Sequence, residues 1–159
     1  MNPLDALVER LDTPLFVVTA ASGGVPQGCL VEFVTQCSIH PPRLLVCLSV
    51  ENRTYAAASE SQAVAVHLLG SDQHDTAELF GEATGDTTDK FAGCSWQPGR
   101  TGAPVLRDCA AWVEGDVLER LRLGDHVGFV IAPVDGGPGS RPDQLDSSSA
   151  HDLRAGHPA

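Results

Sequence analysis

The chain has 159 residues, of which 42% are hydrophobic, the size of one domain with a sizeable single core. Twenty-one acidic residues against ten basic ones give a formal net charge of −11, which repels nucleic-acid phosphates and anionic lipid surfaces. No apolar run approaches the roughly 20 residues of a membrane-spanning helix, and the N-terminus lacks the features of a signal peptide. We therefore expect a cytoplasmic protein that binds neither nucleic acid nor membranes.

The first quarter of the chain predicts a short helix followed by two strands. Residues 2–11 place leucines on one face of an amphipathic helix, and residues 15–20 form a β-branched strand. After a turn at residues 21–24, a long strand is expected over residues 25–38, with Gly28 free to act as a bulge or kink. The long strand is the largest single element expected in this part of the chain.

Two prolines, Pro41 and Pro42, predict an extended corner before the next strand. Residues 43–49 are nearly all apolar, which predicts a strand buried on both faces. A helix with Asn52 as its N-cap is expected to follow, and residues 62–69 predict another strand. This stretch therefore alternates buried strands with one capped helix.

The second half predicts two short helices and two further strands. Ser71 or Asp72 can cap a helix that Gly81 ends, and residues 87–91 predict a second short helix. After a Gly- and Pro-rich loop, strands are expected over residues 105–123 and 126–134. About six strands with short connections predict a mainly β fold, a mostly antiparallel β-barrel with short peripheral helices over residues 1–134.

Residues 135–159 contain no aromatic residue and only two leucines. Such a segment buries too little apolar surface to offset the entropy of ordering, so we expect a disordered C-terminal tail.

The five cysteines argue against metal binding and disulfides. Their number is odd, no two form a C-x-x-C pair, and three lie in apolar, strand-like sequence. We interpret them as reduced thiols used as small hydrophobic side chains and expect no metal site.

The start of the second predicted helix, Asn52-Arg53-Thr54, suits an anion. Backbone N–H groups at a helix N-terminus, a guanidinium and a hydroxyl together favour a phosphate monoester, although an ordinary capped surface helix is the commoner case. Asp125-His126 at the head of the last strand could be a tuned acid–base pair or a simple turn. Glu32 lies among apolar residues and either faces solvent or is buried and paired.

Several motifs, taken in order, resemble the flavin reductase-like family, whose FMN-binding fold is a split β-barrel. The resemblance covers about residues 11–134. It rests on Gly28 and the strand after it, Pro41-Pro42, Asn52-Arg53-Thr54, Phe80-Gly81, the segment 89–93, the segment 102–106 and Gly124-Asp125-His126.

The resemblance implies site residues as well as a fold. The segment after Gly28 would line the flavin ring and ribityl chain, largely through backbone groups, and the start of the helix at residue 52 would hold the phosphate. Lys90, Phe91 and a catalytic His126 would lie near the flavin or nicotinamide face. The implied cofactor-binding residues are Cys29, Leu30, Val31, Glu32, Phe33, Gln36, Cys47, Ser49, Asn52, Arg53, Thr54, Lys90 and Phe91.

The function implied by the resemblance is NADH- or NADPH-dependent reduction of FMN, or of FAD, by a homodimer that can supply reduced flavin to a partner monooxygenase. Hydride transfer between two stacked rings needs few acid–base residues, and this sequence offers few. One alternative is an FMN-binding protein without turnover. Another is a cofactor-free dimeric interaction module, because Leu30, Glu32 and Phe33 stand where the family often has small hydroxyl residues.

Overall fold

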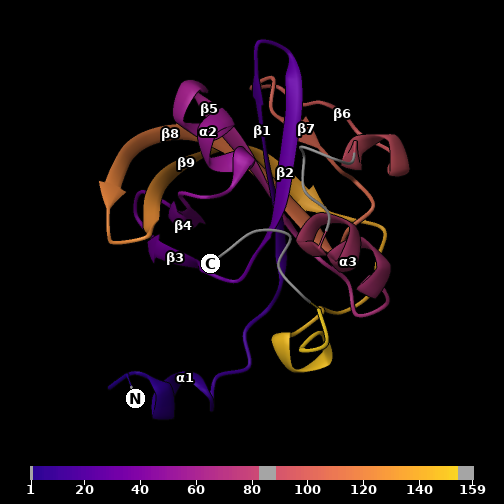
Figure 1. The fold of residues 1–159 in the computed structure, drawn as a ribbon. Coiled ribbons are helices and arrows are strands. Elements are labelled where there is room, and N and C mark those ends of the chain that lie inside the picture. Colours follow the sequence, from indigo (N-terminus) through magenta and orange to yellow (C-terminus); the bar gives the residue numbers. More distant parts are fainter. Residues whose placement is uncertain (1, 83–88, 154–159) are drawn as a thin grey trace.

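The computed structural model describes residues 2–82 and 89–153, and its main element is one antiparallel sheet of seven strands in the order β2-β1-β5-β8-β9-β4-β3. The mainly β, split-barrel fold predicted from the sequence is confirmed (Figure 1). A two-stranded hairpin of β6 and β7 lies beside the sheet. The strands are β1 (Phe16–Ser22), β2 (Val25–Val31), β3 (Val34–Ser38), β4 (Arg43–Ser49), β5 (Ala63–Leu68), β6 (Gln97–Pro98), β7 (Pro104–Val105), β8 (Ala111–Arg122) and β9 (His126–Pro138).

The single long strand expected over residues 25–38 is wrong, because the chain leaves the sheet at Glu32 and Phe33. β2 pairs with β1 at one edge of the sheet, whereas β3 pairs with β4 at the opposite edge. Two register shifts in the long β8–β9 pair fit the strong curvature that carries one edge round towards the other. The sheet therefore curls without closing, and the two-residue junction spans its split.

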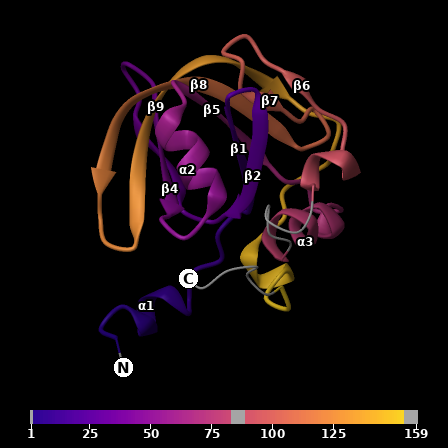
Figure 2. The ribbon, with the colours of Figure 1, turned by 45° about the horizontal axis from the view of Figure 1, so that its top comes forward.

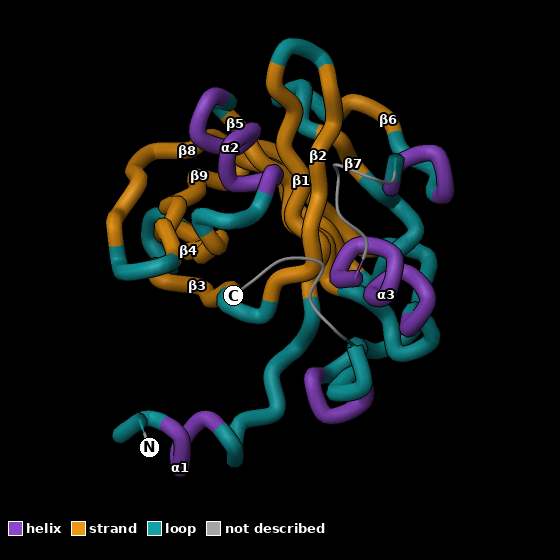
Figure 3. The backbone as a smooth tube through the Cα atoms, in the orientation of Figure 1, coloured by secondary structure: helices purple, strands orange, loops and turns teal. Residues whose placement is uncertain are grey.

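Two helices occupy opposite sides of the β1–β2 pair. Helix α2 (Arg53–Glu60) is rich in alanine, and its Ala57 and Ala58 pack into the main core inside the curl, between β4 and β1–β2 (Figure 2). Helix α3 (His74–Glu82) covers β2 from outside and builds a second core with Phe80 and Phe91. The described helices lie around the outside of the strands or at the open end of the curled sheet (Figure 3).

The N-terminal helix α1 (Asp5–Val8) forms, but its apolar face stays largely exposed. The four side chains of the predicted apolar face are 54–59% exposed, and the helix stands apart from the sheet in Figures 1 and 2. These side chains are Leu4, Leu7, Val8 and Leu11.

Strand β4 has the predicted bounds but is fully buried on one face only. Val46 and Leu48 are buried in the main core, whereas Leu45 and Cys47 on the other face remain partly exposed. The expected burial of both faces is therefore wrong for a single chain, because the outer face of this strand stays partly exposed.

The remaining helical predictions hold in part. Helix α3 begins at His74, after the expected caps, and continues through Gly81 instead of ending there. The short helix expected over residues 87–91 is a 3-10 helix, η1 (Lys90–Gly93), whose cap Asp89 accepts a hydrogen bond from the Phe91 N–H; residues 87 and 88 lie outside the described part.

The C-terminal segment differs from the expected tail in the part that the structure describes. Strand β9 runs on to Pro138, and a second 3-10 helix, η2 (Ser147–Ser149), follows. Leu145 is 3% exposed in the second core, and the Arg141 guanidinium bonds both carboxylate oxygens of Asp108. A few apolar anchors and this ion pair hold a segment that composition alone assigns to disorder.

None of the helices in the described ranges is long and apolar enough to span a membrane.

Candidate functional site

The N-terminus of α2 is a capped helix start at the end of β4. Asn52 has extended backbone dihedrals and caps the helix, and its side-chain oxygen accepts a hydrogen bond of 2.7 Å from the Thr54 N–H. The Asn52 N–H donates to the Ser49 carbonyl at 3.1 Å, which ties the helix start to the end of β4. The predicted cap is confirmed, and the helix dipole favours a negative charge at this point.

A thiol lies beneath this helix start. Cys29 on β2 is 3% exposed, and its sulfur interacts with the side chains of Thr54 and Asn52. Burial raises the pKa of Cys29 to about 11, so the group stays a neutral thiol. Cys29 therefore contributes packing below the helix start.

An aromatic pair lies at the split in the barrel. Phe33 is 57% exposed, and its ring centroid is 5.2 Å from that of His126, with the two planes tilted by 52°. The Cys47 N–H donates to the Phe33 carbonyl at 2.9 Å, which fixes the junction against β4. Ser49 pairs with His126 across the β4–β9 ladder, so the aromatic pair lies one strand end away from the start of α2.

Asp125 holds the His126 ring. The Asp125 carboxylate and His126 Nδ1 are 2.7 Å apart, and because a carboxylate oxygen accepts, Nδ1–H is the donor of this hydrogen bond. This arrangement orients the other ring nitrogen for a bound partner.

Apart from Phe33, the side chains of the predicted ring-lining segment are buried in the two cores or held elsewhere on the surface. Val31 is buried in the main core, and Leu30 packs in the second core against Gly81. Glu32 is exposed, and its carboxylate accepts a hydrogen bond of 3.2 Å from the Thr13 hydroxyl. Since β2 is an edge strand, alternate backbone N–H and C=O groups along it face away from β1, and the Gly28 carbonyl accepts a hydrogen bond from Lys90.

Two predicted residues of the opposite edge are partly or fully open to solvent. Gln36 on β3 is exposed and donates to the Ser38 carbonyl at 3.2 Å. Cys47 is half-buried, and burial raises the pKa of its thiol. Neither side chain contacts the start of α2 in the described hydrogen bonds.

Lys90 and Phe91 lie on the far side of β2 from α2, in the second core. The Lys90 ammonium donates to the carbonyls of Gly28 and Phe80, each at 3.1 Å, and the residue is only 8% exposed. The Phe91 ring packs edge-on against those of Phe80 and Trp96. These residues support the site strand from behind.

Two buried polar residues escaped the sequence analysis. Glu114 on β8 is 1% exposed and accepts hydrogen bonds from the N–H groups of Arg100 and Thr101 and from the Thr101 hydroxyl. His67 on β5 is fully buried between the Val17 carbonyl and the Leu106 N–H. The only sequence signal was a polar residue within an apolar strand, and alternation assigns such residues to solvent.

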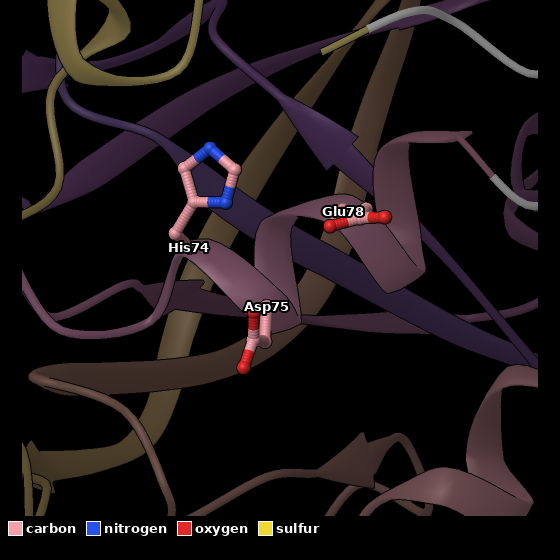
Figure 4. Close-up of side chains that lie close together, drawn as sticks. All are labelled: His74, Asp75 and Glu78. Carbon is pink, nitrogen blue, oxygen red and sulfur yellow. The ribbon is translucent and has the colours of Figure 1, made fainter. Parts of the chain in front are cut away.

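A separate cluster of His74, Asp75 and Glu78 lies at the start of α3, with ligand atoms within 4.8 Å of one another (Figure 4). His74 Nε2 already contacts the Asp152 carboxylate at 3.1 Å, which raises the pKa of the imidazole. The cluster is on the surface and takes no part in the site at the split.

Three features lie at the split of the barrel: the N-terminus of α2, the edge of β2, and the flat side chains of Phe33 and His126. Leu30 and Glu32 point elsewhere, so they do not fill the space between these parts.

Comparison with known proteins agrees with the predicted family. The model of the flavin reductase-like domain matches residues 8–147. A probable flavin reductase of Rhizobium meliloti is 35% identical over 72% of this chain and 36% of its own length. An FMN reductase (NADH) of Methylorubrum extorquens is 30% identical over 78% of this chain and 64% of its own length.

A solved structure agrees as well. The crystal structure of BorF, the flavin reductase component of a bacterial two-component tryptophan halogenase, superposes with a TM-score of 0.80 at 28% identity, over 92% of each chain. The chain spans less than two thirds of the length of each of these two curated relatives. With the family model covering nearly the whole described fold, the chain belongs to the flavin reductase-like domain family.

Proposed function

We propose that this protein reduces a flavin with electrons from NADH or NADPH and that FMN is the preferred flavin, with FAD as the alternative. The observation that carries the proposal is that the start of α2 lies close to the Phe33–His126 pair at the split of the barrel. The family to which the chain belongs supports the same proposal. The names of the relatives, which include an FMN reductase (NADH), support it.

In the proposed complex, Ser49, Asn52, Arg53 and Thr54 hold the phosphate, and the backbone of residues 29–33 holds the flavin ring. The bound flavin supplies the hydride acceptor, for which the nicotinamide is the donor. Phe33 and His126 pack beside the stacked rings and limit access of water. Asp125 keeps the His126 ring oriented, so that its second nitrogen donates to or accepts from a bound ring in one fixed geometry.

We further propose that the protein is a homodimer that buries the outer face of β4, β9 and β8. Above Gly128, Leu45 and Leu123 lie together on this face, and Leu121 and Leu123 are 42% and 57% exposed. A second copy would complete the two-sided burial that the composition of β4 predicts. Leu121→Asp with Leu123→Asp should convert the dimer to a monomer in size-exclusion chromatography with light scattering, and wild-type protein that elutes as a monomer contradicts this part.

The proposed partner is a monooxygenase or a similar flavin-dependent enzyme that receives reduced flavin. The related halogenase system, in which a reductase is one of two components, supports this role. We place the protein in the cytoplasm, where the nicotinamide nucleotides are available and where its five free thiols would stay reduced.

Flavin titration tests the proposed phosphate site. Arg53→Gln should weaken the binding of FMN more than that of riboflavin, because riboflavin lacks the phosphate. The matched control is Arg107→Gln, which removes an exposed cation from the loop before β8. An equal loss for both flavins with Arg53→Gln would place the phosphate elsewhere. A wild-type protein that binds FMN without being reduced by either nicotinamide would be a flavin-binding protein without turnover, and one that binds no flavin would be an interaction module.

A further inference from the structure

Lys90 is the only lysine in the 159-residue sequence, and it is buried. The other nine basic residues are arginines, none of which is buried in the part of the chain that the structure describes. Burying an ammonium group is costly unless hydrogen bonds replace its water. The Lys90 ammonium donates to the carbonyls of Gly28 on β2 and Phe80 on α3, each at 3.1 Å. A lysine whose ammonium group stayed in water would cover the same apolar surface with its side-chain carbons at a lower desolvation cost. The burial of the charge therefore requires another explanation.

The ammonium group binds a backbone carbonyl of β2, an edge strand that also packs against α2. Gly28 packs tightly, since a Cβ at this position would lie 2.9 Å from the Phe80 ring and 3.2 Å from the Phe91 ring. The next residue is Cys29, whose thiol interacts with Thr54 and Asn52 at the helix start. The positive charge of Lys90 also acts on this thiol. One peptide unit therefore separates the atom that Lys90 binds from the residue beneath the anion site.

We propose that Lys90 is a positioning residue for the flavin phosphate, an inference that rests on the proposed flavin site. Its hydrogen bonds hold β2 in register beneath α2, and its positive charge adds to the field of the helix start. A charge in the protein interior is screened less by salt than a surface charge, so it acts on the phosphate through the thin layer formed by β2. Lys90 does not touch the flavin.

Two substitutions separate the charge from the packing. Lys90→Met keeps the length of the side chain and removes both the charge and the donors, whereas Lys90→Arg keeps the charge. FMN and riboflavin dissociation constants are measured by quenching of flavin fluorescence. With Lys90→Met we expect FMN binding to weaken on the order of tenfold and riboflavin binding to change far less. Lys90→Arg should restore much of the difference, and the control Arg107→Met, with the same loss of net charge, should leave it unchanged.

The wild-type protein provides a second test, which does not depend on the folding of a variant. A protein labelled with ¹³C and ¹⁵N in lysine has one set of lysine side-chain NMR signals, all from Lys90. Addition of FMN should shift the Nζ and Cε signals and raise the pKa of the ammonium group, and riboflavin should do so much less. Equal responses to the two flavins, or equal weakening of both by Lys90→Met, overturn the role of Lys90. Absence of flavin binding by the wild-type protein overturns the proposed function itself.

Discussion

Protonation of His67 should destabilise the fold in acid. The imidazole is fully buried on β5, Nδ1–H donates to the Val17 carbonyl at 2.8 Å, and Nε2 accepts from the Leu106 N–H at 2.9 Å. A proton on Nε2 would break the second bond and place a charge in the core. Burial therefore lowers the pKa of His67 from 6.5 to about 4.

The sign and size of the effect follow from this shift. Between pH 4 and 6.5 the unfolded chain binds the proton and the folded chain does not, so the stabilisation is complete above pH 6.5 and decreases as the pH falls towards 4. A shift of this size corresponds to a loss of about 3 kcal/mol in the free energy of unfolding.

Urea unfolding of the wild type and of His67→Gln at pH 7.5 and pH 4 measures this loss. His67→Gln should be less stable at pH 7.5 but should lose about 3 kcal/mol less on acidification. The control is His74→Gln, because Asp152 raises the pKa of His74 and its contribution has the opposite sign. Identical acid losses for the wild type and His67→Gln would refute the assignment.

Three further substitutions test other parts of the fold by urea unfolding. Gly28→Ala places a Cβ against the Phe80 ring and should cost about 1–3 kcal/mol, whereas Gly137→Ala, with open space around its Cβ, should cost far less; equal costs would contradict the close packing. Glu114→Gln weakens the hydrogen bonds that hold the loop before β7 and should cost about 1–3 kcal/mol, and no loss would mean that solvent replaces them. Leu145→Ala should cost about 2–5 kcal/mol, and a cost near zero would show that the C-terminal segment does not pack in solution.

The secondary-structure elements that depend on the local sequence pattern could be predicted from the sequence. β4 has the expected bounds because its apolar run ends at the polar residues before α2, and Asn52 caps α2 because its short side chain reaches the N–H two residues on. The turn after β1 was predictable in the same way, since Gly23 and Gly24 both adopt positive φ, at 58° and 79°.

The missed features depend on which strands meet. The chain through Glu32 and Phe33 looks like continuous strand, and only the pairing of β2 and β3 with opposite edges breaks it. The burial of Lys90 was hidden for a related reason, because its two acceptors come from β2 and α3. Distant contacts also hold the C-terminal segment, through Leu145 and the second core, and composition cannot reveal them.

Anaerobic reduction of the purified protein with bound flavin is the most direct test of the proposed function. The protein is loaded with FMN, freed of excess flavin and mixed with NADH, and separately with NADPH, while the flavin absorbance is followed. We expect at least one of the two nicotinamide nucleotides to bleach the oxidised flavin band on the time scale of enzymatic turnover. The rate of flavin reduction should be lower in Phe33→Ala and in His126→Ala. A bound flavin that neither NADH nor NADPH bleaches would contradict the assignment as a flavin reductase.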